Sequence, residues 1–340
     1  MIDHSKAIKQ GNLVEVRNLK KYFPVQKGYL EQILAGRVDY VRAVDGVSFD
    51  IRQGEAFGLA GESGSGKSTI GRLVIGLDTP TEGQVTFDGI DLSTQSSEEM
   101  RRLRRRMQVI FQDPMASLNP RMTLGEAVSQ GLKIHFAELA NQHREMVMRV
   151  FDRVGLTPAQ YFYNKYPHQI SGGQRQRVVI ARALITQPDL VLADEPIAMA
   201  DVSVRALLLD LMVQLKKELN LTYLFITHDL ATAKYICDRI GILYLGRMAE
   251  VGDLPEVYST PLHPYTRALM AAVPVPDPHE RRTTLMPEGE IPNPINPPSG
   301  CRFHPRCPYA QAICSQEEPV LRELRPEHQV ACHFAEQFLE

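Results

Sequence analysis

One glycine-rich segment, GESGSGKST, spans residues 61–69 between an apolar run and a pattern typical of a helix. It fits the phosphate-loop pattern G-x-x-x-x-G-K-[ST], which requires a strand before it and a helix after it. Glycine lets the backbone wrap closely around phosphates because no Cβ blocks the approach, and the helix N-terminus adds positive potential. The segment therefore predicts a nucleotide site rather than a plain glycine turn. Its members are Gly61, Glu62, Ser63, Gly64, Ser65, Gly66, Lys67, Ser68 and Thr69, with Lys67 on the β- and γ-phosphates.

Two adjacent carboxylates, Asp194 and Glu195, end the short apolar run DLVLADEP at residues 189–196. Side chains alternate along a strand, so neighbouring acids can take different roles where the strand ends. We predict that Asp194 and the Ser68 hydroxyl hold Mg²⁺, and that Glu195 polarises the attacking water as general base. An isolated acid pair is more typical of a solvated strand end, but the phosphate loop upstream favours the catalytic interpretation.

Four of the five cysteines gather near the C-terminus with the spacing C-x₅-C-x₆-C-x₁₇-C: Cys301, Cys307, Cys314 and Cys332. This spacing lacks the C-x₂-C pairs of common zinc sites. Disulfides are disfavoured in a reducing cytosol, so the cluster indicates tetrahedral Zn²⁺ or an iron–sulfur cluster. Free or disulfide-capable thiols are the alternative. His304 and His333 flank the cysteines and could substitute as ligands.

Bulk properties restrict the class of protein. The chain has 340 residues, 44% hydrophobic and 23% charged, with a net charge of −2, so its overall charge does not indicate nucleic acid. The N-terminus shows no secretory signal and no apolar run is long enough to span a bilayer, so we expect a soluble cytoplasmic chain. The basic run RRLRRR at 101–106 is interpreted as a solvated helix face.

The elements that must position these residues alternate between apolar strands and helical patterns. Strands are predicted within residues 12–23, 40–61, 81–92, 189–196 and 221–229, and helices over 67–77, 97–107 and most of 123–165. Buried strands alternating with helices imply an α/β fold with a largely parallel sheet. Residues 24–40 predict an irregular insertion, and eight prolines at 273–298 predict an extended linker.

Four motifs in order, VIFQDP (109–114), ISGGQRQR (170–177), LVLADEP (190–196) and FITHDL (225–230), identify a family resemblance. Together with the phosphate loop they resemble the nucleotide-binding domain of ABC ATPases over residues 13–258. The resemblance implies an ABC-type P-loop NTPase fold: a mostly parallel sheet core, an antiparallel β subdomain and a helical signature subdomain at about 115–170. We assign this domain to residues 1–258.

The resemblance also implies roles for matching residues. Gln112 contacts Mg²⁺ or the lytic water and senses the membrane partner, and His228 hydrogen-bonds the γ-phosphate. An aromatic near the N-terminus stacks on adenine, with Phe23 favoured by spacing and Tyr22 as the alternative. Asp201 is the D-loop aspartate. The signature Ser171, Gly172, Gly173 and Gln174 caps the γ-phosphate of a partner's ATP.

One chain carries one phosphate loop and one signature, so the resemblance implies complete sites only in a dimer that sandwiches two ATP molecules. The D-loop departs from the usual Ser-Ala-Leu-Asp and contains Ala198, Met199, Ala200 and Asp201. The lost serine hydroxyl affects communication between subunits, whereas the acid, base and switch residues are all present. We predict an active ATPase; a partner that binds ATP without hydrolysing it is the alternative.

Three further segments, FQDPMASLNPRMTLGEAV, TPLHPYTRALMAAVP and PPSGCRFHPRCPYAQAIC, resemble ATP-binding subunits of oligopeptide/dipeptide (peptide/opine/nickel) importers. This implies peptide import at the cytoplasmic face of the membrane, with a related second ATPase chain, two permeases and an extracytoplasmic binding protein. Oligosaccharide, nickel and opine import are alternatives, as is a soluble ABC ATPase acting on nucleic acid or ribosomes, although no nucleic acid is expected.

The C-terminal extension is assigned to residues 259–340, with its linker at 273–298 and the four-cysteine segment at 301–332. The resemblance implies a [4Fe–4S] cluster on these cysteines, because some members of the subfamily carry one there. Its expected purpose is to staple a small segment that has little core of its own.

Overall fold

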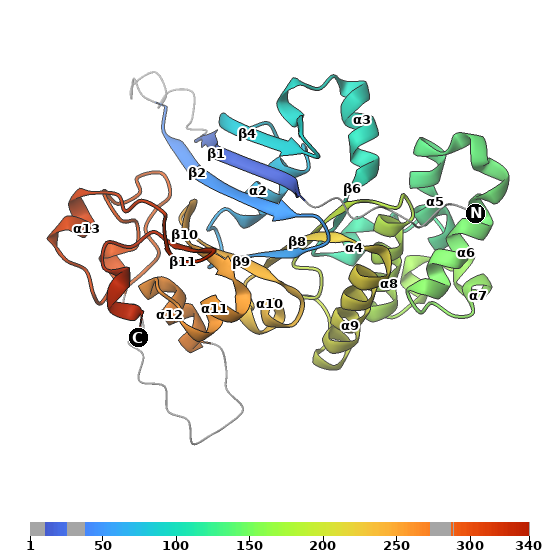
Figure 1. Ribbon diagram of the computed structural model, residues 1–340. Coiled ribbons are helices and arrows are strands. Elements are labelled where there is room, and N and C mark those ends of the chain that lie inside the picture. Colours follow the sequence, from blue (N-terminus) through green and yellow to red (C-terminus); the bar gives the residue numbers. More distant parts are fainter. Residues whose placement is uncertain (1–10, 26–37, 273–286, 288, 340) are drawn as a thin grey trace. The chain divides into compact units, whose positions relative to one another are not determined.

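The computed structural model describes residues 11–25, 38–272, 287 and 289–339. The chain forms two compact units, whose elements are labelled in Figure 1. Unit 1 consists of Met1–Asn12, Ile51–Ala56 and Thr94–Ile226, and unit 2 of Leu13–Asp50, Phe57–Ser93 and Thr227–Glu340. The predicted irregular segment 24–40 and linker 273–298 lie largely outside the described residues.

Unit 1 contains a parallel sheet of buried strands in the order β8-β7-β6. Leu190 pairs with Thr222 on one side and with Met107 on the other, in parallel register. The strands are almost wholly apolar, as expected for strands covered on both faces. Their bounds are β6 Met107–Ile110, β7 Leu190–Asp194 and β8 Thr222–Thr227.

Several helices of unit 1 begin at clear capping signals. Ser96 with Glu99, and Thr123 with Glu126, form capping boxes that satisfy the first helical amides. The helices are α3 Ser97–Arg106, α4 Pro114–Ser117, α5 Leu124–His135, α6 His143–Arg153, α7 Ala159–Tyr163, α8 Gly172–Leu184 and α9 Val202–Leu219, with 3₁₀ turns at Ala137–Gln142 and Pro167–Gln169. The predicted helical stretch over 123–165 is confirmed.

Unit 2 contains an antiparallel sheet in the order β2-β1-β4-β5. Its bounds are β1 Asn12–Pro24, β2 Tyr40–Arg52, β4 Glu82–Phe87 and β5 Ile90–Asp91, followed by a 3₁₀ turn at Leu92–Thr94. The predicted strand pair at 81–92 is confirmed, and Asp88 and Gly89 form its turn with positive φ.

A second sheet in unit 2 has the order β3-β9-β10-β12-β11, in which β3 and β9 run parallel and the other pairs antiparallel. The strands are β3 Ala56–Ala60, β9 Arg239–Tyr244, β10 Arg247–Asp253, β11 Arg322–Arg325 and β12 His328–Val330. The helices are α2 Lys67–Val74, α10 Leu230–Ile236, α11 Leu254–Ser259, α12 Pro264–Ala272 and α13 Ala312–Gln316, with 3₁₀ turns at His304–Arg306 and Ala335–Phe338. The C-terminal strands β12 and β11 therefore continue the strand order that includes β3, β9 and β10.

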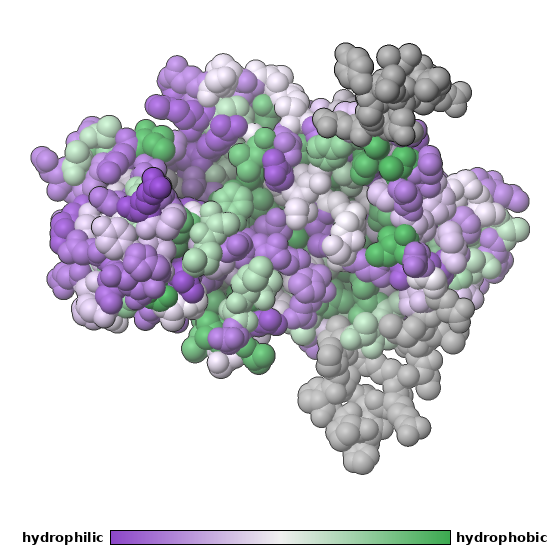
Figure 2. Space-filling model, turned by 180° about the vertical axis from the view of Figure 1, so that it is seen from behind, coloured by the Kyte–Doolittle hydropathy of each residue, from purple (hydrophilic) through white to green (hydrophobic). Residues whose placement is uncertain are grey.

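Neither unit contains a helix suited to a bilayer: within the described ranges, none is both long and apolar enough to cross one. On the face shown in Figure 2, hydrophilic residues prevail and the hydrophobic ones form separate patches.

The C-terminal region is anchored to β10 by a buried carboxylate. Glu250 is fully buried, and its two oxygens accept from the backbone amides of Leu262 (2.8 Å) and His263 (2.9 Å). The ring of His328 on β12 lies 2.7 Å from the same carboxylate. One side chain thus fastens both the segment before α12 and strand β12, which lies between β10 and β11.

We expect Glu250→Gln to lower the free energy of unfolding by about 3 kcal/mol, because an amide donor replaces one buried carboxylate oxygen and is forced against backbone N–H groups. Thermal unfolding of the nucleotide-free chain measures this. Glu256→Gln, which alters a half-exposed carboxylate 3.5 Å from Arg325, should change stability little. Equal stability of the two variants would show that Glu250 is not the anchor.

Candidate functional site

Two glycines in the phosphate loop allow close approach of backbone segments. Gly61, which follows β3, has φ 148°, and an added Cβ would lie 2.2 Å from the carbonyl oxygen of Leu243. Gly66 has φ 105°, and its Cβ would lie 2.3 Å from the carbonyl oxygen of Ala43. Larger residues cannot occupy these positions without moving the backbone, so the loop conformation depends on glycine.

Lys67, the first residue of α2, is buried within the loop. Its ammonium group donates to the carbonyl oxygens of Gly61 (2.8 Å) and Glu62 (2.9 Å) and to the Ser65 hydroxyl (3.3 Å). Gly66 caps α2 in the left-handed conformation, and no side chain of the described chain caps this helix end. The first amides of α2 and the lysine charge together suit a phosphate group.

Ser63, Gly64 and Ser68 are exposed along the same loop and helix, and Thr69 is half-buried. The hydroxyl of Ser68 therefore lies on the surface side of the first turn of α2, where a ligand can reach it.

Gln112 and Glu195 meet in unit 1, although they come from separate motifs. Gln112 Nε2 donates to Glu195 Oε2 at 2.8 Å. Asp194 is the last residue of β7, and Glu195 follows with φ 46°, a left-handed conformation that is strained for glutamate. The Glu195 amide bonds to the carbonyl of Ile226 at 3.0 Å, which fixes this turn.

The signature segment forms the N-terminus of α8. Ser171 is the N-cap: its hydroxyl accepts from the Gln174 amide (3.3 Å), and its own amide donates to the Gln174 side chain (3.0 Å). An added Cβ at Gly172 would meet no heavy atom of the described chain within 4 Å, whereas one at Gly173 would lie 2.7 Å from Val204. Gly172 thus faces open space and Gly173 packs against α9.

The D-loop precedes α9 and is held by an arginine. Arg205 Nε donates to the Ala200 carbonyl (2.8 Å), and its Nη2 donates to the Ala198 carbonyl (3.2 Å). Asp201 caps α9 and is exposed, as is Met199. The loop backbone is therefore fixed without the serine that usually begins this motif.

Three predicted ligand-contacting residues lie in unit 2 outside the phosphate loop. His228 is exposed and directly follows β8. Phe23 near the end of β1 is also exposed, with the Lys21 ammonium 5.1 Å from its ring centroid. The Tyr22 hydroxyl, in contrast, donates to Asp45 at 2.5 Å. Burial, together with this bond, raises the pKa of Tyr22. Phe23 thus offers a more accessible ring than Tyr22.

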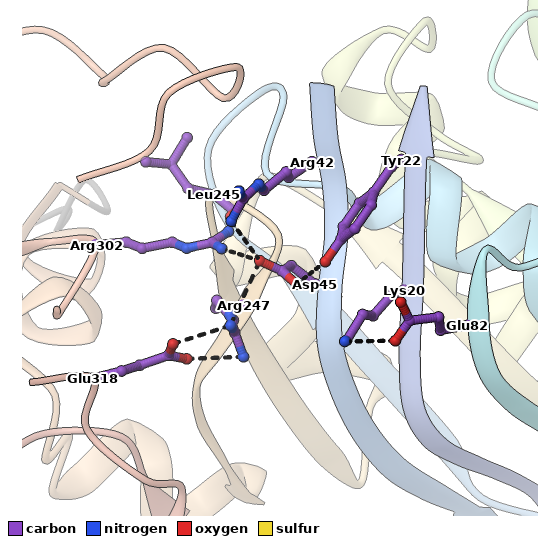
Figure 3. A network of polar contacts seen from close by, with 9 residues as sticks. All are labelled: Lys20, Tyr22, Arg42, Asp45, Glu82, Leu245, Arg247, Arg302 and Glu318. Atoms are coloured by element: carbon purple, nitrogen blue, oxygen red, sulfur yellow. Dashed lines mark hydrogen bonds and ion pairs between the residues drawn. The ribbon is translucent and has the colours of Figure 1, made fainter. Parts of the chain in front are cut away.

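Asp45 is the centre of a polar network in unit 2 (Figure 3). Besides Tyr22 it contacts Arg302 from the four-cysteine segment and Arg247 from β10, the latter at 3.5 Å. Burial opposes ionisation of Asp45, but the Tyr22 hydroxyl and the two arginines outweigh it and lower the pKa of this carboxyl. The C-terminal region is therefore tied to strand β2.

Two residues without a predicted role contact the phosphate loop. Arg306 forms a bidentate pair with the Glu62 carboxylate, with N–O distances of 2.8 and 3.1 Å. The buried hydroxyl of Tyr265 accepts from the Glu62 amide at 2.8 Å. Tyr265 belongs to the HPYT segment, for which the sequence indicated no chemistry. Only its place in a distinctive motif could have drawn attention to it.

The four cysteines line one pocket: Cys301, Cys307, Cys314 and Cys332. None of them forms a disulfide within the described part of the chain. Burial and mutual repulsion raise the pKa of the Cys301, Cys307 and Cys332 thiols to about 11. Across the described ranges, no three His, Cys, Asp or Glu side chains are arranged as a ready-made metal site.

The two flanking histidines also line this pocket, but their ring nitrogens face backbone carbonyls. His304 Nδ1 lies 2.9 Å from the Cys301 carbonyl oxygen, and His333 Nε2 lies 3.0 Å from that of Glu317. The thiols are therefore the more available ligands.

The predicted residues divide between the units. Unit 1 holds Gln112, the signature, Asp194, Glu195 and Asp201, and brings Gln112 to Glu195. Unit 2 holds the phosphate loop, both candidate aromatics, His228 and the cysteines, and places the four thiols around one pocket.

Comparison with known proteins agrees with these motifs. Residues 44–198 match the ABC transporter family, and residues 249–314 match the oligopeptide/dipeptide transporter C-terminal region. The oligopeptide transport ATP-binding protein AppF of Bacillus subtilis is 47% identical over 96% of this chain and 98% of its own length. A putative peptide import ATP-binding protein of Brucella ovis is 49% identical over 94% of this chain and 97% of its own length.

Solved structures confirm the predicted fold class. A dimeric ATP-binding cassette in a post-hydrolysis state, bound to ADP and Pi, superposes with a TM-score of 0.61 at 31% identity. The match covers 71% of this chain and 98% of that cassette. The chain therefore belongs to the ABC transporter family of ATP-binding proteins, within the group that carries the oligopeptide/dipeptide transporter C-terminal region.

Proposed function

We propose that this chain binds and hydrolyses ATP to power the import of oligopeptides or dipeptides through a membrane ABC transporter. The observation that carries the proposal is the similarity to peptide-import ATP-binding proteins along nearly the whole chain, including the C-terminal region. Import of an oligosaccharide, nickel or an opine by the same machinery is the alternative cargo.

The proposed ATP site assigns one role to each predicted residue. Phe23, with Tyr22 as the alternative, stacks on adenine, and Lys67 and the α2 amides bind the phosphates. Glu195 accepts a proton from the attacking water, and His228 donates to the γ-phosphate. The Gln112–Glu195 bond supports these assignments because it places a polar amide beside the base.

Mg²⁺ fits the available ligands: the Ser68 hydroxyl, the Gln112 amide oxygen and, through water, the Asp194 carboxylate. All three are hard oxygen donors, and Ser68 is exposed at the first turn of α2. When bound, the ion neutralises charge on the β- and γ-phosphates.

We further propose that complete sites form only when the Ser171–Gln174 signature of one subunit covers the ATP of another. The partner is a related ATPase chain, and the two ATPase chains bind two permeases at the cytoplasmic face of the membrane. An extracytoplasmic binding protein delivers the substrate to the permeases. Ser171 and Gly172 of the signature and Met199 and Asp201 of the D-loop are exposed, which supports this arrangement, and the similar cassette is itself dimeric. We propose that the chain has two functional domains. The first is residues 1–258, with a helical part at about 115–170, and the second is residues 259–340.

Reconstitution tests the proposal. The chain, co-purified with its permeases in vesicles, should hydrolyse ATP faster when a peptide-loaded binding protein is added, and labelled peptide should accumulate. Stimulation by a non-peptide solute alone would favour another cargo. A salt-sensitive affinity for RNA or DNA, with no response to permeases, would favour the soluble class instead.

For the cysteines we propose a [4Fe–4S] cluster, with Zn²⁺ as the alternative. The proposal is supported by four thiols around one pocket and by histidines whose nitrogens are engaged elsewhere. Chain purified without oxygen should be brown and contain about four irons per molecule. Cys307→Ser should lose most of the colour, whereas Cys237→Ser, outside this group, should retain it. A colourless chain with one zinc would support Zn²⁺, and a metal-free one would contradict both.

A further inference from the structure

Glu62, the second residue of the phosphate loop, is bound through three of its groups. Its carboxylate pairs with both terminal nitrogens of Arg306, its amide donates to the Tyr265 hydroxyl, and its carbonyl accepts from Lys67 at 2.9 Å. The first two anchors come from the C-terminal region. The Arg306 side chain is 10% exposed and that of Glu62 26%, so this pair is largely shielded from solvent.

The position of Arg306 is itself well defined. It ends the 3₁₀ turn that begins at His304, and its amide bonds to the Phe303 carbonyl at 2.9 Å. A guanidinium nitrogen also lies 3.3 Å from the Tyr244 hydroxyl on β9. The arginine is thus held by contacts with both the turn and the sheet.

Two physical consequences follow for the loop. Glycine-rich loops have many backbone conformations, so anchoring the side chain and amide of Glu62 reduces the entropy lost when phosphates bind. A carboxylate inside the loop also repels a triphosphate, and the paired guanidinium offsets that repulsion. Both effects increase ATP affinity without touching the reacting atoms.

We infer that Arg306 and Tyr265 are positioning residues of the phosphate loop, which neutralise Glu62 and hold it so that the loop is ready for ATP. The inference rests on the proposed ATP site. ATP affinity in this chain therefore depends on side chains supplied from beyond the residues 44–198 that match the ABC transporter family.

The test compares Arg306→Gln, Glu62→Gln and the double variant in titrations with Mg-ATP and in steady-state hydrolysis with the transporter complex. Arg306→Gln should weaken ATP binding roughly tenfold and raise KM correspondingly, with kcat nearly unchanged. Adding Glu62→Gln should restore most of the affinity, because the unpaired carboxylate is gone. Tyr265→Phe should weaken binding by about threefold to fivefold, since one amide loses its acceptor.

Arg325→Gln is the matched control, because it removes another arginine–glutamate pair of the same region. It should leave ATP affinity unchanged. Unaltered affinity in Arg306→Gln, or a double variant no better than the single one, would overturn the inference. Should Arg306→Gln not fold, Arg306→Lys, which keeps the charge but not the bidentate geometry, should bind ATP with intermediate affinity. If the unmodified chain does not bind Mg-ATP, the proposed function itself fails.

Discussion

Replacing Glu195 with glutamine is expected to leave Mg-ATP bound while slowing hydrolysis by about 10²–10⁴-fold. Glutamine has nearly the same shape as glutamate. In the unmodified chain Gln112 Nε2 donates to Glu195 Oε2 at 2.8 Å, and the glutamine oxygen can still accept this hydrogen bond. The change therefore preserves the contact and removes only the ability to accept a proton. The loss corresponds to about 3–5 kcal/mol of activation free energy.

Single-turnover phosphate release and equilibrium ATP binding measure the two quantities separately. The ATP-bound dimer should accumulate in the Glu195→Gln variant, because closure no longer leads to cleavage. Glu82→Gln, which alters an exposed glutamate paired with Lys20, should keep the full rate. A Glu195→Gln chain with unchanged turnover would show that another group activates the water.

The Gln112–Glu195 contact illustrates what the sequence could predict. In the parallel pair β6–β7, Ile110 lies opposite Ala193. Gln112 and Glu195 each follow two residues later, so both lie at the same edge of the sheet. The parallel rule brings these two side chains together once β6 is known, but no strand was predicted from the sequence over residues 107–110. The phosphate loop was predictable because its glycines act locally.

The ends of helices and the long-range contacts were harder to predict from the sequence. Helix α2 was predicted to reach Leu77 but ends at Val74, because Gly76 turns left-handed just after it. The contacts of Glu62 with Tyr265 and Arg306 span more than 200 residues and depend on how the C-terminal chain returns to the loop. No local pattern encodes such a path, so HPYT was recognisable as a motif without revealing its contact.

The cysteine site could be predicted only in part from the sequence. Its spacing predicted a shared site, and the four thiols do line one pocket, but spacing alone does not distinguish zinc from iron. The same holds for the D-loop, where the sequence shows a missing serine. The contact of Arg205 with two D-loop carbonyls becomes visible only in the fold.

The composite site makes its strongest prediction at Gly172. An aspartate at this first position of α8 fits the chain itself, since an added Cβ meets no atom of the described residues within 4 Å. It also suits the helix N-terminus, where negative charge is favourable. The fold and ATP binding to the phosphate loop should therefore be retained. In the proposed dimer, however, the carboxylate would face the γ-phosphate held by the partner, and like charges in a closed interface repel.

Gly172→Asp is accordingly expected to lower ATP hydrolysis by at least about 100-fold, or about 2.7 kcal/mol, and to prevent ATP-dependent association. Sedimentation with Mg-ATP and phosphate release measure the two effects. Ser97→Asp is the matched control, because it places the same carboxylate at the exposed first position of α3, far from the signature in sequence. Full activity of Gly172→Asp would mean that the signature does not cover a nucleotide. Loss of ATP binding by the isolated variant would mean that the signature serves the ATP of its own chain. An isolated chain has no partner, so the substitution can then affect only a site within the same molecule.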